Sequence, residues 1–304
     1  LPSYDYLYFK QGNEENAGYY SVDRTRQREV SFFGTGTYSY KGRYTLNGTV
    51  RYEGSNKLGK SRKARWLPTW NVSAAWNAHE EEFWQSFRDV VSNMTLKASY
   101  SLTADRGPAS VSNSKAIINS YNTWRPFTSV KESGLILSSV ENSELTYEKK
   151  HELNIGAEIG FIDNRINIEA DWYTRNNFDL IGLIYTKGTG GQLAKFANVA
   201  SMKSSGVEFT VSTRNIKTKD FSWNTDFIFS HTKNEVTDLQ SNASVMDMIS
   251  GNGFAMEGYP VRALFSMDFQ GLNENGYPTF INEKGQLTVS DINFQEQLKK
   301  DHLV

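Results

Sequence analysis

Apolar and polar residues alternate one by one along several stretches of this chain. In residues 43–53 the side chains of Tyr44, Leu46, Val50 and Tyr52 share one face, and mostly polar or charged residues lie between them. The same pattern runs through residues 93–102, 152–161, 165–173 and 222–231. A period of two indicates a β-strand whose two faces meet different surroundings. Weaker alternation in other stretches raises the expected total to about ten strands of an all-β fold: 4–10, 31–41, 66–76, 205–214 and 262–270.

The expected strands are long. Tyr44 to Tyr52 is a run of nine residues. At ~3.4 Å per residue and a tilt of ~40° such a run covers roughly 21 Å, close to the ~25 Å apolar band of an outer-membrane barrel. Aromatic residues stand at both ends of the apolar face, as Trp66 and Trp76 do on a second strand, and amphipathic rings favour the membrane interface. Periodicity alone fits a soluble β-sandwich equally well.

The expected connections are alternately short and long. Lys41-Gly42, Asp163-Asn164 and 215–220 are short, and 77–92 is a modest link in which residues 80–91 predict one short helix. The long connections are 54–65, 104–144, 178–204 and 234–261. Outer-membrane barrels have short periplasmic turns and long extracellular loops, whereas a sandwich has no reason to place every long loop on one side. We therefore expect an antiparallel transmembrane β-barrel. Its outward strands would begin near 43, 93, 165 and 222, and its inward strands near 66, 146, 205 and 262.

Composition excludes several classes of protein. The 33 Lys and Arg against 34 Asp and Glu, a net charge of −1, provide no basic field for nucleic acid. The absence of cysteine excludes disulfide frameworks and cysteine-ligated zinc. The 7 Trp, 16 Tyr and 18 Phe favour β structure. The chain begins at Leu1 and ends in polar residues, and we expect both ends to lie inside a longer protein.

Several segments, in order, resemble the C-terminal half of a SusC/RagA-type TonB-linked outer-membrane transporter. The resemblance covers most of the chain and rests on the order and spacing of these segments together. They are residues 34–76, with Arg51-Tyr52-Glu53-Gly54-Ser55-Asn56 and Arg65-Trp66-Leu67-Pro68; Glu82-Phe83 followed by residues 96–103; residues 147–156; Asn198-Val199-Ala200 with Ser205-Gly206-Val207-Glu208; and Gly258-Tyr259-Pro260.

The resemblance implies a 22-stranded barrel with an N-terminal plug, located in the cell outer membrane. It implies import of glycans or peptides driven through TonB, which acts on the plug, and a SusD-like surface lipoprotein as the partner that covers the barrel. We expect residues 1–304 to be one part of such a barrel domain, with the plug domain and the closing strands absent from this sequence. About ten strands cannot close that barrel, so this chain alone would not transport.

For ligand contact, the resemblance and the loop lengths direct attention to loop 104–144. Tyr121, Trp124 and Arg125 lie in it. Aromatic faces stack on the C–H surfaces of sugars, and the guanidinium of an arginine offers a forked pair of donors. These three residues are the candidate ligand-binding residues. Alternatively, their rings pack within the loop or against the lid protein.

Other motifs give weaker signals. Five cations between Lys57 and Arg65 are expected to contact lipopolysaccharide phosphates or an anionic ligand, or simply to lie in a solvated loop. His79 precedes three glutamates but lacks the spacing of a zinc-binding helix, so a polar helix start is the better interpretation. Residues 273–276 predict a hairpin turn. We expect no metal, no cofactor and no catalytic residues.

Two functions of different classes remain open. One is nutrient import through an outer membrane, with contacts to membrane lipid and lipopolysaccharide. The other is a soluble carbohydrate-binding β-sandwich or adhesin. They differ in where Val50, Ala98 and Phe227 lie, because a sandwich would place these side chains in a dry interior between two sheets, whereas a membrane barrel would leave them on an outer face. A hydrolase is a third idea for which the sequence offers no residues.

Overall fold

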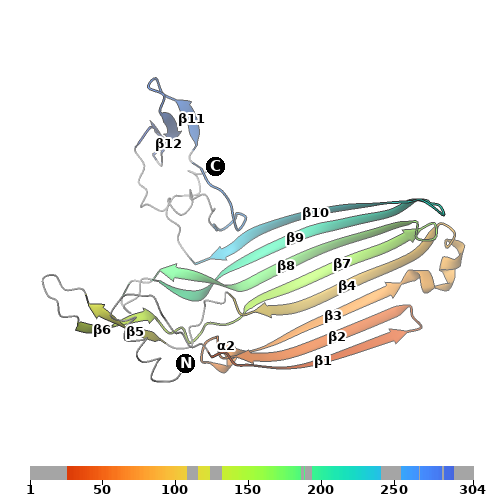
Figure 1. The fold of residues 1–304 in the computed structure, drawn as a ribbon, viewed down its shortest axis with the longest axis horizontal. Coiled ribbons are helices and arrows are strands. Elements are labelled where there is room, and N and C mark those ends of the chain that lie inside the picture. Colours follow the sequence, from red (N-terminus) through yellow and green to blue (C-terminus); the bar gives the residue numbers. More distant parts are fainter. Residues whose placement is uncertain are drawn as a thin grey trace.

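The structure, a computed structural model, describes residues 26–107, 116–123, 132–185, 188, 194–240, 255–266, 268–282 and 284–290. Eight long strands form one antiparallel sheet in the order β1-β2-β3-β4-β7-β8-β9-β10. The strands lie side by side in Figure 1. Their bounds are β1 Glu29–Tyr40, β2 Tyr44–Ser55, β3 Trp66–Asn77, β4 Val91–Asp105, β7 Glu148–Phe161, β8 Ile166–Tyr185, β9 Ala194–Lys217 and β10 Ser222–Leu239.

Smaller elements lie outside this sheet. The short helix α2 (Arg62–Arg65) follows β2, and the 3-10 helices η1 (Ala78–Glu80) and η2 (Glu82–Ser86) follow β3. A separate hairpin pairs β5 (Ile117–Thr123) with β6 (Glu132–Ser139). A third sheet pairs β11 (Phe269–Leu272), β12 (Pro278–Ile281) and β13 (Leu287–Thr288). No helix among the described residues is both long and apolar enough to cross a bilayer.

All tight turns between neighbouring long strands lie at one end of the sheet, and the longer excursions lie at the other (Figure 1). Lys41 and Gly42 both have positive φ, 53° and 71°, as a two-residue hairpin turn between right-twisted strands requires. The Asp163-Asn164 turn is tight as well, since the Arg165 amide donates to the Phe161 carbonyl. The predicted alternation of short turns and long loops is therefore confirmed.

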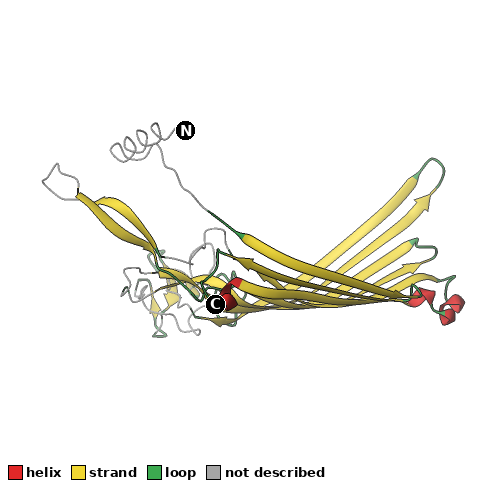
Figure 2. Ribbon diagram, turned by 90° about the horizontal axis from the view of Figure 1, so that it is seen from below, coloured by secondary structure: helices red, strands yellow, loops and turns green. Residues whose placement is uncertain are grey.

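The main sheet is a single layer, and Figure 2 shows it curved, with its strands splayed. Its apolar face is not covered: Val50 is 58% exposed and Phe227 57% exposed, and Ala98 is also exposed. A two-layer sandwich with these side chains in a dry interior is thereby ruled out, and with it the soluble sandwich. No pairing joins β1 to β10 in the described part of the chain, so the sheet is not closed.

Two local predictions are wrong. Residues 80–91 do not form one helix, because Glu81 separates η1 from η2 with an extended backbone (φ −80°, ψ 148°). Its carboxylate is held by Arg43, Tyr44 and Trp76, which fixes the chain there. Residues 262–270 are not one strand: the Ala263 amide turns back to the Pro260 carbonyl, and β11 begins only at Phe269.

Other predictions differ in extent. The proposed loop 178–204 is mostly strand, because β8 and β9 pair as far as Tyr185 and Ala194. Loop 104–144 contains the β5–β6 hairpin. The Asn273–Gly276 hairpin turn is confirmed, with the Gly276 amide donating to the Asn273 carbonyl at 2.9 Å. The predicted strand 4–10 lies outside the described residues.

Candidate functional site

The sheet has a polar face opposite its apolar one. Directly paired residues show this: Asn71 of β3 pairs with Ser101 of β4, and Ser101 pairs with Glu152 of β7. Glu152 pairs in turn with Arg175 of β8. Because paired residues of an antiparallel sheet point to the same side, these side chains form a continuous polar row across the strands. That row lies toward the loop end of the sheet.

The loop end is locked by a small buried cluster, which we call the loop junction. Leu58, Leu145 and Tyr147 are completely buried there, although they lie outside the eight long strands. Against them pack partly buried residues from the ends of four strands, Leu67, Ala104, Ile181 and Phe196. The loop junction therefore packs the loop after β2 against the segment before β7, although the two are distant in the sequence.

Backbone bonds draw these loops close together. The Gly59 amide donates to the Leu145 carbonyl at 2.8 Å, and the Lys60 amide donates to the Ser143 carbonyl at 3.1 Å. A Cβ at residue 59 would lie 2.0 Å from the Ser143 carbonyl oxygen, so this approach requires glycine. The Asn198 amide group donates to the carbonyls of Thr146 and Asp179 and accepts from the Thr146 amide.

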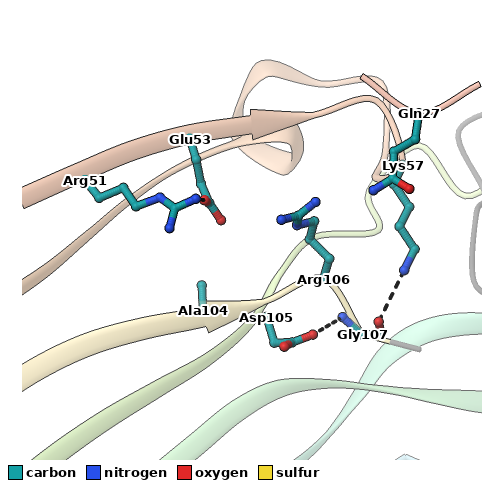
Figure 3. Close-up of a pocket in the computed structure, with 8 residues that line it drawn as sticks. All are labelled: Gln27, Arg51, Glu53, Lys57, Ala104, Asp105, Arg106 and Gly107. Carbon is teal, nitrogen blue, oxygen red and sulfur yellow. Dashed lines mark hydrogen bonds and ion pairs between the residues drawn. The ribbon is translucent and has the colours of Figure 1, made fainter. Parts of the chain in front are cut away.

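A cavity of about 400 Å³ opens beside the junction at the loop end (Figure 3). Three sequence-distant segments build it: the residues before β1, the end of β2 with the start of the following loop, and the end of β4 with the residues after it. Among the described residues its lining is dense in charge and contains no aromatic side chain. The lining residues are Gln27, Arg51, Glu53, Lys57, Ala104, Asp105, Arg106 and Gly107.

Most charges of the cavity already have partners. The Arg51 guanidinium lies 2.6 Å from the Glu53 carboxylate, and Arg106 pairs with Glu29. The Lys57 ammonium donates to the Gly107 carbonyl at 3.2 Å (Figure 3). Arg51 is nevertheless 49% exposed along its side chain, whereas Glu53 is only 12% exposed. The cavity therefore presents charges of both signs to solvent, because Arg51 is more exposed than Glu53, whereas Glu29 is more exposed than Arg106 and Asp105 is exposed as well.

The pKa of Tyr147 in the loop junction responds to burial and to a charged residue of the cavity, Glu53. Burial raises the pKa of Tyr147 to about 12, and the negative charge of Glu53 contributes in the same direction. The Tyr147 hydroxyl donates to the Arg65 carbonyl at 3.2 Å. Tyr147 is therefore a neutral donor at physiological pH, joining the loop after β2 to the segment before β7.

A second hollow, of about 440 Å³, lies further along the polar face. Hydroxyl and amide side chains line most of it, including those of Thr45, Asn47 and Ser99, together with Lys97 and Asp171. Lys97 is ion-paired with Glu158. The polar face therefore continues from the loop-end cavity toward the turn end, as a surface suited to water and polar solutes.

The turn end is held by a different network. Glu81 accepts hydrogen bonds from the Tyr44 hydroxyl, the Trp76 indole and the Arg43 guanidinium. The Tyr44 bond contributes most to holding the pKa of Glu81 below its usual value. His79 contacts the backbone of Met94 through Nδ1 at 2.9 Å. In the described segments no group of three or more acidic or histidine side chains is placed to hold a metal.

The side chains of the three predicted ligand residues lie outside the described part of the structure. Tyr121 lies on β5, where its backbone pairs with Gly134, and its side chain is not described. Trp124 and Arg125 lie outside the described residues. Of the five cations in 57–65, only Lys57 lines the cavity; Lys60 pairs with Glu141, and the Arg65 side chain donates to the Gly59 carbonyl.

Sequence reasoning missed most of the cavity. Arg51 and Glu53 carry the period-two signal of one strand face, but nothing local links them to Arg106, more than fifty residues later. That proximity comes from the β2-β3-β4 order of the sheet.

Comparison with known proteins agrees with this fold. The family described as TonB dependent receptor-like, beta-barrel, matches residues 2–276. The chain therefore belongs to the TonB-dependent receptor family, as a portion of its β-barrel. Members of this family are outer-membrane proteins, and the outer membrane is the location of this barrel.

The chain is also similar in sequence to individual members of the family. The chain is 27% identical over 285 residues to TonB-dependent receptor SusC of Bacteroides thetaiotaomicron, which covers 87% of this chain and 28% of SusC. It is 26% identical over 261 residues to TonB-dependent receptor P3 of Formosa agariphila, covering 81% of this chain and 25% of P3. The chain thus spans about a quarter of the length of these relatives.

Solved structures share the fold. A structure of the RagAB peptide importer in its open-open state matches with a TM-score of 0.74 and 21% identity, over 89% of this chain and 29% of the matched one. Another, of the RagAB peptide transporter, matches with a TM-score of 0.73 and 22% identity, over 91% of this chain and 29% of the other. The expected SusC/RagA-type likeness is confirmed.

Proposed function

We propose that this chain supplies strands and outer loops to a TonB-linked importer that takes up glycans or peptides. The observation that carries the proposal is the placement of a charged cavity on the polar face, beside the locked loop junction and at the end where the long loops gather. In a barrel this face lines the lumen, and long loops face the cell exterior. A solute arriving from outside would meet the cavity first.

The proposal includes the rest of the protein. Residues 1–304 form part of a barrel domain, and further strands pair with the exposed edges of β1 and β10. A plug domain fills the lumen and connects the barrel to TonB. A SusD-like surface lipoprotein covers the loop end, and lipopolysaccharide surrounds the barrel. Support comes from the open sheet and from the named relatives, which are receptors and importers.

The proposed role is binding and passage, without catalysis. The charged groups around the cavity are arranged as ion pairs and backbone contacts, which suit the recognition of polar solutes. Tyr121, Trp124 and Arg125 remain proposed ligand contacts, because the β5–β6 hairpin also lies at the loop end of the sheet (Figure 1).

Uptake by cells tests the proposal. Cells lacking the gene would be complemented with the intact gene, with Arg51→Ala plus Arg106→Ala, or with the matched control Arg62→Ala plus Lys63→Ala. The control removes two exposed cations from α2, at the same end but outside the cavity lining.

Uptake of labelled oligosaccharide and peptide pools would be measured with and without a protonophore. We expect uptake of one pool to require the gene and the proton gradient, to fall at least about tenfold in the cavity variant, and to persist in the control. Equal uptake in cells lacking the gene would refute import. Equal uptake by the cavity variant would refute the placement of the site.

A further inference from the structure

A belt of hydrogen-bond donors lies across strands β7–β10 on the apolar face of the sheet, where the apolar residues of these strands end. The last apolar row on β8 and β9 contains Trp172, paired with Val207, and β10 carries His231 in that row. One row nearer the loops, Thr174 pairs with Ser205, and Ser205 pairs with Lys233. In the next row, His151 pairs with Asn176, and Asn176 with Lys203. We call these six residues the donor belt: Thr174, Ser205, Lys233, His151, Asn176 and Lys203.

The belt is confined to one half of the sheet. In the row of His151, strands β4, β3 and β2 carry Leu102, Trp70 and Val50. The apolar surface therefore extends further toward the loops on β2–β4 than on β7–β10. Such a step in the apolar boundary indicates a specific polar contact over β7–β10, because β2–β4 are still apolar at that depth.

Stacked aromatic rings lie beside the donor belt on the same face of the sheet. The His151 imidazole stacks between the rings of Tyr100 and Phe178, with centroid distances of 5.7 and 5.5 Å. The Lys149 ammonium lies 5.7 Å from the centre of the Phe178 ring and 2.5 Å from the Asp179 carboxylate. These contacts place Lys149, His151 and Phe178 on the same face.

Charge within the belt favours an anion at the row nearest the apolar band. Lys203 and Lys233 are both exposed. On β8 and β9 the row of Lys233 holds the hydroxyls of Thr174 and Ser205, and on β7 it holds the apolar Leu153. Acidic groups lie further out: Glu235 pairs directly with Lys203, Asp179 binds Lys149, and Asp238 pairs with Ser201 one row beyond.

We propose that the donor belt binds a phosphate of lipid A in the outer leaflet of the outer membrane. Lipid phosphates lie at the depth where acyl chains end, which is the depth of the belt when the loop end faces outward. Lysine keeps its stem along apolar surface while its ammonium reaches this level, and hydroxyl and amide donors complete the shell of phosphate oxygens. The inference rests on the outward orientation of the loop end but not on any cargo.

Binding of purified lipid A to the intact receptor in detergent tests the inference. The variant is Lys203→Gln plus Lys233→Gln. The matched control, Lys41→Gln plus Lys217→Gln, removes two exposed lysines at the turn end of the sheet. The probes are phosphorylated lipid A, the same lipid after enzymatic dephosphorylation, and inorganic phosphate. Native mass spectrometry gives bound lipid, and heat-modifiable gel mobility shows that each variant is folded.

We expect each lost lysine to weaken phosphorylated lipid A binding about fivefold, and the pair about 25-fold. The control should bind like the parent protein, and dephosphorylated lipid should bind the parent as weakly as phosphorylated lipid binds the variant. Equal binding of both lipids to the parent would overturn the inference, even if the variant failed to fold. Loss of binding in the turn-end control instead would show that the opposite end carries the site and would also contradict the outward orientation. Saturation by inorganic phosphate alone would show a free-anion site.

Discussion

The hydroxyl of Tyr147 donates a hydrogen bond of 3.2 Å to the backbone carbonyl of Arg65, a residue 82 positions earlier in the chain. Tyr147 is completely buried, and Arg65 closes the short helix α2. One side chain thereby connects the loop after β2 to the segment that leads into β7. The loop-end cavity lies beside this connection, so its shape depends on it.

Tyr147→Phe should loosen the loop junction while leaving the strands paired. The substitution removes the donor and leaves the part-buried Arg65 carbonyl without it, a cost of about 1 to 2 kcal/mol. We expect faster proteolytic cleavage within residues 54–65, measured in detergent. Tyr277→Phe is the control, because Tyr277 is exposed. Identical cleavage rates for parent and Tyr147→Phe would show that the bond does not hold the loop.

The raised pKa of Tyr147 predicts that the loop junction loses stability at alkaline pH. Burial raises the pKa of Tyr147 from 10.0 to about 12, so the folded state favours the protonated phenol. That contribution is fully present below about pH 10 and is lost as the pH rises through 12. We expect the parent protein, but not Tyr147→Phe, to lose junction stability across this window. A phenolate absorbance difference between the two proteins that appears near pH 10 would contradict the prediction.

At the turn end, Glu81→Gln should destabilise the link between β3 and β4. The Tyr44 hydroxyl, which is the main cause, and the Trp76 and Arg43 side chains hold the pKa of Glu81 below its usual value. A lowered carboxyl pKa adds stability above the unfolded pKa, and that stability is lost as the pH falls through the folded pKa.

The difference between thermal melts of Glu81→Gln and of the parent should therefore be largest at neutral pH and should shrink as the pH falls below the usual range of a glutamate. Glu82→Gln provides the control, since the Glu82 side chain is 91% exposed and lies 3.7 Å from Arg43. A difference between parent and Glu81→Gln that stays constant from neutral to acid pH would exclude an ionised Glu81 as the source of stability.

The apolar face of the sheet should tolerate no charge at its centre. Leu96 pairs with Ala157, midway along the apolar residues of β7. Leu96→Arg should cost ~2–4 kcal/mol in a bilayer and prevent assembly. Ser99→Arg places the same side chain on the polar face of the same strand and should assemble. Outer-membrane fractionation with heat-modifiable mobility measures both, and normal assembly of Leu96→Arg would show that this face does not meet lipid.

Strands were predictable where each residue faces one of two different surroundings. In β2 and β4 the alternation is nearly complete, and the predicted bounds differ from the observed ones by only a few residues at either end. Prediction failed where tertiary contacts decide the backbone. Glu81 interrupts an expected helix because three distant side chains bind it, and the outer parts of β8 and β9 are strand because they pair with each other.

The cavity was harder to predict from the sequence than the strands were. Lys57 was a candidate for anion contact, but Arg51 and Arg106 join it only through the β2-β3-β4 arrangement. The donor belt shows the same limit. Lys203 and Lys233 are thirty residues apart, and only the registers of β8, β9 and β10 place them in adjacent rows.

Each long strand pairs with the long strand that precedes or follows it in the chain, and the β5–β6 hairpin is an insertion that leaves this order intact. Such a meander lets every new strand add to the edge formed just before it, with short loop closures at the turn end. The sheet can therefore assemble one strand at a time, in the order of the sequence. The loop junction would form late, because it needs the loop after β2, the segment before β7 and the ends of β3, β4, β8 and β9.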